Sequence, residues 1–207
     1  MANSNPEARL AIALEIVKGA SNGNFLAEGI WHPLGFLNIK IKYDREVVRL
    51  HIWNTKTQSR NSNLIHNHHW DLHSYVICGT LRNITYQIVD ECYEQKFRIN
   101  QVEYHGLTNR IIPTNRVVSV QIHSVGEYSP GEFYRIDAGV FHCSELVANF
   151  PIATLVFEES VWPRQPEILC DESERHVRVI ERQACSPQEL SLNLGLVIEC
   201  ISVCPNS

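Results

Sequence analysis

Residues 66–73 read His66-Asn67-His68-His69-Trp70-Asp71-Leu72-His73, and this stretch decides how the rest of the chain is interpreted. It holds four of the ten histidines of the protein. In an extended strand, residues two apart share a face, so His66 and His68 can present two imidazoles to one metal ion. The stretch therefore predicts a metal site built on a strand, with His69 pointing away.

A third ligand is expected from a distant segment, because two side chains hold a metal ion weakly. The segment from Gly131 to His142 supplies the candidate. Its Asp137-Ala138-Gly139 triplet suits a tight turn that would bring His142 back over the first two histidines. We predict one mononuclear site with His66, His68 and His142 as its ligands.

The segments around these histidines alternate apolar and polar residues with a period of two. Leu37, Ile39 and Ile41, for example, alternate with polar residues, as a strand with one buried face does. Runs of this kind occupy residues 37–42, 48–53, 74–81, 84–89, 97–104, 117–125, 132–137 and 152–158. Many short strands separated by turn residues predict an all-β fold, either a sandwich or a jelly-roll barrel.

A helix is predicted at each end of the strand-rich region. Apolar residues recur at helical spacing over about residues 6–19. Ser186-Pro187-Gln188-Glu189 has the pattern of a capping box and opens a last helix that runs to about residue 200. We expect residues 1–207 to form a single domain, with a barrel core over about 37–160 and a C-terminal extension over about 163–207.

The charge pattern bears on the partners of the protein. The formal net charge is −5 with acidic and basic residues interspersed, and no basic stretch is present to neutralise the phosphates of a nucleic acid. A small-molecule substrate is the expected partner. No apolar run approaches the roughly 20 residues that cross a bilayer, and a signal peptide is not evident. We therefore expect a cytoplasmic protein with no membrane partner.

The first histidine stretch resembles the first sequence motif of the cupin superfamily. His66 and His68 match its His-x-His pair, and Gly79 matches its final glycine. The departures are Arg60 in place of the first glycine, and Leu72 or His73 in place of the glutamate.

The second stretch resembles the second cupin motif, in which Gly131, Gly139 and His142 fit while Asp137 and Leu146 replace a proline and an asparagine. The resemblance covers about residues 48–158 and implies the cupin fold, a double-stranded β-helix or jelly-roll barrel. The long stretch between the motifs implies an extra hairpin and a loop over 105–116 that covers the site. The resemblance also implies a homodimer as one oligomeric state, which the sequence leaves open.

The missing glutamate leaves three neutral histidines as the implied ligand set. This set resembles that of the thiol dioxygenase branch of cupins, such as cysteine dioxygenase, and implies Fe(II) and a small thiol or carboxylate substrate. Imidazole nitrogen by itself does not select the metal, so Zn, Ni and Mn stay open. His73 is an alternative fourth ligand, if a bulge at residues 69–72 turns it inward.

Four charged or titratable residues on predicted strands are candidates for work on a substrate. Arg49 and Arg135 could anchor a carboxylate through paired hydrogen bonds, and both could equally be surface ion pairs. His51 and His123 could act as an acid or a base, and both could equally be structural.

Four further residues could support the site. Tyr75 and Tyr134 could donate a hydrogen bond to bound oxygen, although strand aromatics are more often core residues. Together with His123 and Arg135, Tyr75 completes our set of candidate catalytic residues. Trp70 would pack beside the ligands, and Asp71 would fix the tautomer of a histidine, with His51 and Arg49 also placed around the ligands.

Three functions remain open at this point. The first is a non-haem iron dioxygenase, and the second is an isomerase or lyase that uses the metal as a Lewis acid. The third is a cupin that binds a metal or small ligand without turnover, because a fold alone does not determine function.

Overall fold

The structure is a computed structural model that describes residues 6–43, 46–54, 64–89 and 95–203. Within these ranges the chain forms two helices and eleven strands. The helices are α1 (Pro6–Ser21) and α2 (Pro187–Val203). The strands are β1 (Ala27–His32), β2 (Phe36–Tyr43), β3 (Glu46–Trp53), β4 (Trp70–Val89), β5 (Phe97–His105), β6 (Thr108–Tyr128), β7 (Phe133–Ile136), β8 (Phe141–Val161), β9 (Glu167–Asp171), β10 (Arg178–Glu181) and β11 (Gln183–Ala184). Neither helix is long and apolar enough to cross a membrane.

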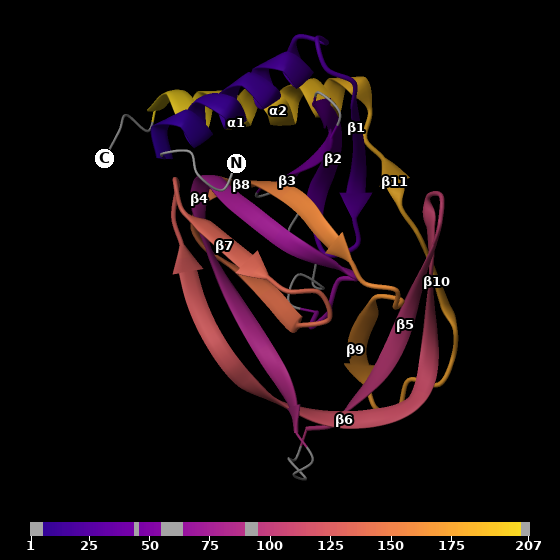
Figure 1. The fold of residues 1–207 in the computed structure, drawn as a ribbon. Coiled ribbons are helices and arrows are strands. Elements are labelled where there is room, and N and C mark those ends of the chain that lie inside the picture. Colours follow the sequence, from indigo (N-terminus) through magenta and orange to yellow (C-terminus); the bar gives the residue numbers. More distant parts are fainter. Residues whose placement is uncertain (1–5, 44–45, 55–63, 90–94, 204–207) are drawn as a thin grey trace.

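The strands form one antiparallel sheet in the order β11-β1-β2-β3-β8-β4-β6-β5-β9, with β10 beside β6 and β7 beside β4 (Figure 1). The prediction of a β fold with a helix at each end is confirmed. The named strands do not close into a ring, because β11 and β9 end the path. Isolated bridges at His66 reach His142 in β8 and Ile168 in β9, so this residue lies in the seam between the two strands.

Both helices cover the same face of the sheet, over β2, β3, β4 and β8 (Figure 1). Leu37, Ile39 and Leu50 point to this face and are fully buried, as alternation along β2 and β3 requires. They pack in one cluster with Ile16 of α1 and Val197 of α2. Burial of each such side chain contributes roughly 1.5–3 kcal/mol, so this layer is a major source of stability.

The opposite face of the same strands carries a second cluster and the polar residues. Trp53 of β3 and Trp70, Leu72 and Val76 of β4 belong to that cluster. Arg49 lies between inward-facing Val48 and Leu50, and it therefore points to this second face. One sheet thus separates a helix-covered apolar layer from the side that holds the candidate site.

The sheet extends beyond the predicted core of residues 37–160. At one end β1 begins at Ala27, and at the other β9 pairs with β5. Residues 105–116 do not form the expected loop over the site, because they complete the hairpin of β5 and β6 around Gly106. The runs predicted at 74–81 and 84–89 belong to the single strand β4, whose pairing with β8 shifts register on either side of Cys78.

The capping box predicted at the start of the last helix is present. The Ser186 backbone amide donates to Glu189 Oε2 at 2.8 Å, and the Glu189 amide donates to Ser186 Oγ at 3.2 Å. Replacement of Ser186 by Ala should lower the free energy of unfolding by about 1 kcal/mol, since the Glu189 amide loses its acceptor and the reciprocal pair is broken. Urea unfolding measures this effect. The matched change at exposed Ser191 in the same helix should cost little, and equal losses in both variants would contradict the capping role.

Candidate metal centre

Three imidazoles converge on the second face of the sheet. One side-chain nitrogen from each of His66, His68 and His142 lies within 4.8 Å of the others. The ring centroids are 4.5 Å apart for His66 and His142, and 5.0 Å apart for each of the other two pairs. The three predicted ligands are therefore brought together, and the group could hold a metal ion.

A single antiparallel backbone pair creates this convergence. The His66 amide donates to the His142 carbonyl at 3.0 Å, and the His142 amide donates back to the His66 carbonyl at 2.8 Å. Residues that exchange both hydrogen bonds are directly opposite, and their side chains lie on the same face. His68 follows two residues after His66, and alternation returns it to that face.

The backbone also determines which ring nitrogen is available in two of the ligands. His66 Nδ1 lies 2.9 Å from the Leu64 carbonyl, and His142 Nδ1 lies 3.1 Å from the Val140 carbonyl. A carbonyl oxygen only accepts, so each Nδ1 carries the proton and donates it. Each Nε2 is left with a lone pair for a metal ion, the arrangement that metal-binding histidines commonly adopt.

Asp71 does not supply the tautomer control that we predicted for it in these two histidines. Its carboxylate accepts a hydrogen bond from the Ala138 amide at 2.8 Å and one from Arg135 at 3.0 Å. Arg135 also pairs with Asp137 at 2.6 Å, and its side chain is 56% exposed. Asp71 and Arg135 therefore brace the turn that precedes His142, and the Arg135 guanidinium is engaged by two carboxylates of the protein.

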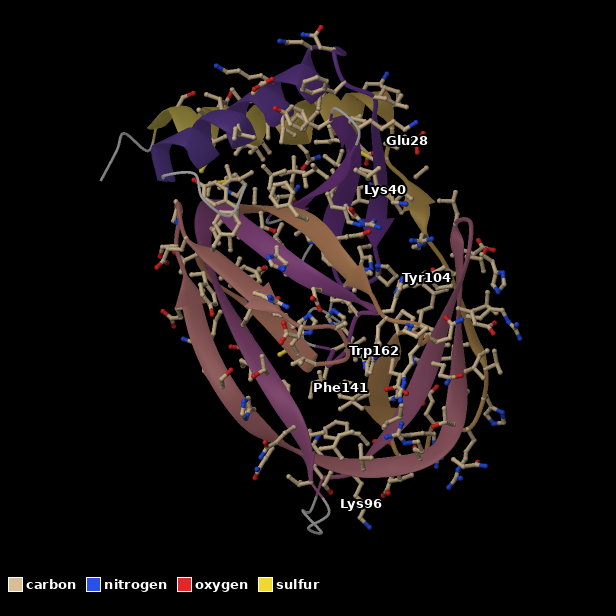
Figure 2. All side chains as sticks on the ribbon, viewed as in Figure 1. Glu28, Lys40, Lys96, Tyr104, Phe141 and Trp162 are labelled. Carbon is tan, nitrogen blue, oxygen red and sulfur yellow. The ribbon has the colours of Figure 1, made fainter. Side chains whose placement is uncertain are left out.

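Gly139 joins the two histidine segments at that turn. Its φ of 81° lies in the left-handed region, and its amide donates to the His68 carbonyl at 2.8 Å. The Trp162 ring packs directly on its Cα, where a Cβ atom would collide with the ring. Figure 2 shows Trp162 and Phe141 near the centre of the fold. This position therefore requires glycine for both its φ and its contact with Trp162.

Trp70 and Asn67 hold the segment that carries His68 in place. The Trp70 ring stacks on His68, with centroids 4.5 Å apart and planes 22° apart. Asn67 lies on the opposite face of the segment. Its backbone amide donates to the Glu167 carbonyl at 2.9 Å, and its Oδ1 accepts a hydrogen bond from the Glu167 backbone amide at 2.7 Å. Trp70 was expected beside the ligands. Asn67 was missed, although a residue between two ligands on a strand must face the opposite side.

Burial keeps the ligand histidines neutral. It lowers the pKa of His142 to about 3, with a smaller contribution from His66. It also lowers the pKa of His66, and it lowers that of His68 well below its ordinary value, with His142 adding to the effect. Metal binding requires neutral imidazole, so all three side chains are ready to bind an ion at neutral pH.

Two further histidines lie on the same side of the sheet. His32, at the end of β1, stacks on Phe36 at 4.4 Å, and its Nδ1 accepts the Leu34 amide at 3.2 Å. His51 of β3 packs against Phe36 at 4.6 Å, and burial lowers its pKa well below the ordinary value. His32 was missed because β1 was not predicted, although residues 27–32 are followed by Pro33, a common strand terminator.

Other predicted residues are not part of the group of three histidines. Tyr75 is 2% exposed and belongs to the core beneath the helices, 5.0 Å from the Phe133 ring, so it lies on the face of the sheet opposite the three histidines. His73 of β4 lies opposite Arg135 of β7 and Phe157 of β8. It is not part of the described ligand group. His123 is exposed on β6, where it lines an open groove of about 430 Å³ that reaches His68.

Tyr134 and Cys143 are also buried, and neither is placed to act as a reactive group. Tyr134 packs on Tyr128 at 4.8 Å, and burial raises its pKa. Cys143 follows His142, faces the other side, and lies 3.5 Å from the Tyr86 hydroxyl. Both residues therefore serve in packing.

Comparison with known proteins adds no family to this description. No family model matches the chain, and no curated protein matches it. The local geometry of the three histidines is therefore the basis for any functional assignment.

Replacement of Gly139 by Ala should destabilise the protein by about 2 kcal/mol, because the new methyl group forces both the backbone and Trp162 to move. The same change should weaken metal binding, since the Gly139 amide holds the His68 carbonyl. Urea unfolding and metal titration measure the two effects. Gly131, with a φ of 90° and no atom within 4 Å of the position that a Cβ would take, is the matched control. Its Ala variant should cost about 1 kcal/mol and leave metal affinity unchanged.

Acidification should destabilise the metal-free protein through His32. Burial, followed by the charges of His66 and two arginines, lowers the pKa of His32 from 6.5 to about 3. The unfolded chain therefore binds a proton between these values that the folded chain does not, and stability falls as the pH decreases through this window. One such group contributes a slope of about 1.4 kcal/mol per pH unit.

The His32→Asn variant isolates this effect because its side-chain oxygen can still accept the Leu34 amide. Urea unfolding at several pH values between about 7 and 5 should show a shallower slope in this variant than in the parent. His176→Asn, at an exposed position, should keep the parental slope. An unchanged slope in the His32 variant would contradict the assignment.

Proposed function

We propose that the protein is a mononuclear metal-dependent cupin, and that its iron(II) form is a dioxygenase for a small thiol or carboxylate substrate. The observation that carries the proposal is the convergence of His66, His68 and His142, with Nδ1 of two of them bound to backbone carbonyls. The long strands β4, β6 and β8 and the bridges at His66 support a jelly-roll fold around this group.

The ligand set supports the choice of chemistry. Within the described residues the ligand group contains three imidazoles and no carboxylate. Neutral ligands leave the charge of a divalent ion uncompensated, which favours an anionic group of the substrate as a further ligand. Ferrous iron in such a site would supply the activation of oxygen.

The chain itself contributes the orientation of the ligands. Trp70 holds the ring of His68, and the Gly139 turn fixes the approach of His142. Arg49, expected as a carboxylate anchor, is paired with Glu158 and lies 5.9 Å from the centroid of Trp70. Its guanidinium therefore supports Trp70 and is already engaged by a carboxylate of the protein.

One alternative function has an observation in its favour. Three neutral histidines, two of them with a tautomer fixed by a backbone carbonyl, also form a common catalytic zinc set. In that case the protein would be an isomerase or lyase in which Zn, Ni or Mn acts as a Lewis acid. The two functions differ in their need for iron and oxygen.

Metal analysis of protein purified without added metal tests the proposal. We expect iron at about one ion per chain, and at least a ~100-fold weaker affinity for Fe(II) in His66→Ala, because a ligand is removed. His105→Ala, in the exposed hairpin of β5 and β6, is the matched control and should bind like the parent.

Oxygen consumption with a panel of small thiols and carboxylates then separates the functions. Turnover by the iron form supports the dioxygenase. Zinc in the purified protein and turnover without oxygen would favour the Lewis-acid enzyme. A parent protein that binds no divalent metal would overturn both.

A further inference from the structure

A cavity of about 200 Å³ lies beside the metal centre on the side of His66. His32, Leu34, Leu64, His66 and Ile168 line one side of it. The cavity adjoins the open groove at His68, with which it shares Asn67 and Glu167 in its lining, and it faces the same side of the sheet as the ligand rings. Any molecule inside it would therefore lie next to a ligand of the metal.

The other side of the cavity is formed by β5, β6 and β10. The register places Tyr104, Asn109 and Ile180 in one row across the three strands, and Val102, Ile111 and Arg178 in the next. All six line the cavity, because residues opposite each other or two apart share a face. Figure 2 shows Tyr104 projecting from β5. Asn109 is in the middle strand and is held by backbone pairing on both sides.

Asn109 is the exceptional residue in this lining. Its side chain is 5% exposed, and its Oδ1 has no hydrogen-bond partner within the described part of the protein. Its neighbour Ile111 and Ile168, which pack in one apolar cluster with Cys170, are also buried. Buried polar atoms are nearly always paired, and an amide oxygen can only accept. The missing partner is therefore an N–H or O–H donor.

The charged residues of the cavity are already engaged. Arg178 pairs with Glu174 at 3.0 Å and donates to Cys170 Sγ at 3.2 Å. Asp171 accepts hydrogen bonds from Ser173, and Glu167 accepts one from Asn67. The partly exposed pair of Arg178 and Glu174 marks the end of the cavity nearer solvent. A neutral donor suits this lining better than a charged group.

We propose that this cavity is the substrate chamber of the metal centre, and that Asn109 determines specificity by accepting a hydrogen bond from the substrate. The inference rests on the proposed function. The substrate is a small, largely apolar molecule with two polar ends. One end reaches the ion beside His66, and the other presents a neutral N–H or O–H to Asn109 Oδ1.

Two probes test this role, one with a hydroxyl donor and one in which a methyl group replaces the hydroxyl hydrogen. They are 3-methylbutan-1-ol and its methyl ether, which share the apolar body and the oxygen but not the O–H. Titration of the zinc-loaded protein, followed by NMR through the side-chain amide of Asn109, gives both affinity and location. We expect the alcohol to bind about tenfold more tightly than the ether, the value of one neutral hydrogen bond.

Two variants give the test its controls. Asn109→Leu preserves the shape and removes the acceptor, so the alcohol and the ether should bind equally, and its thermal stability should be no lower than that of the parent. Backbone amide signals report binding in this variant. Ile180→Trp fills the cavity from β10 and should abolish binding of both probes. Equal binding of the two probes by the parent, or a preference for the alcohol that persists in Asn109→Leu, would overturn the proposal.

The metal-deficient variant separates this inference from the proposed function. His142 does not line the cavity, so His142→Ala should lose zinc and retain the preference for the alcohol. If the parent fails to bind metal but prefers the alcohol, the cavity is a donor-specific binding site and the metal function fails. If the parent binds metal but not the probes, the chamber fails and the metal centre stands.

Discussion

The pair of backbone hydrogen bonds between His66 and His142 is the constraint on which the site depends. It joins a segment before β4 to the start of β8, and the adjacent bridge to Ile168 continues the connection into β9. Because the bonds use main-chain atoms, they fix the separation of the two Cα atoms and the face that both side chains share. The imidazoles are thereby placed before any ion is present.

The sheet solves a second physical problem, which is the cost of enclosing histidines. His32, His51, His66, His68 and His142 are all held neutral by burial. A neutral imidazole still needs partners for its polar atoms, and backbone groups pair with one ring nitrogen in each of His32, His66 and His142. The apolar layer between the sheet and the helices is physically separate. It can therefore stabilise the fold without restricting the chemistry on the opposite face.

Local signals in the sequence predicted the parts of the structure that depend on local rules. The spacing of His66 and His68, the turn at Gly139 and the capping box at Ser186 each reflect geometry within a few residues. The position of Tyr75 could also have been predicted, because alternation from Trp70 and Leu72 places it on the opposite face. The remaining features depend on pairing between distant segments. The partners of Asp71, the contribution of β9 and the hairpin over residues 105–116 follow from register, which a single sequence does not define.

The seam at His66 has a consequence for how this protein can change over time. Its bonds belong to the main chain, so they are available to any residue other than proline at positions 66 and 142. In the proposed metal site, exchange of imidazole for carboxylate or thiolate there would alter the preferred metal ion while the architecture is preserved. Point substitutions at these two positions can therefore change the metal preference of the proposed site independently of the fold.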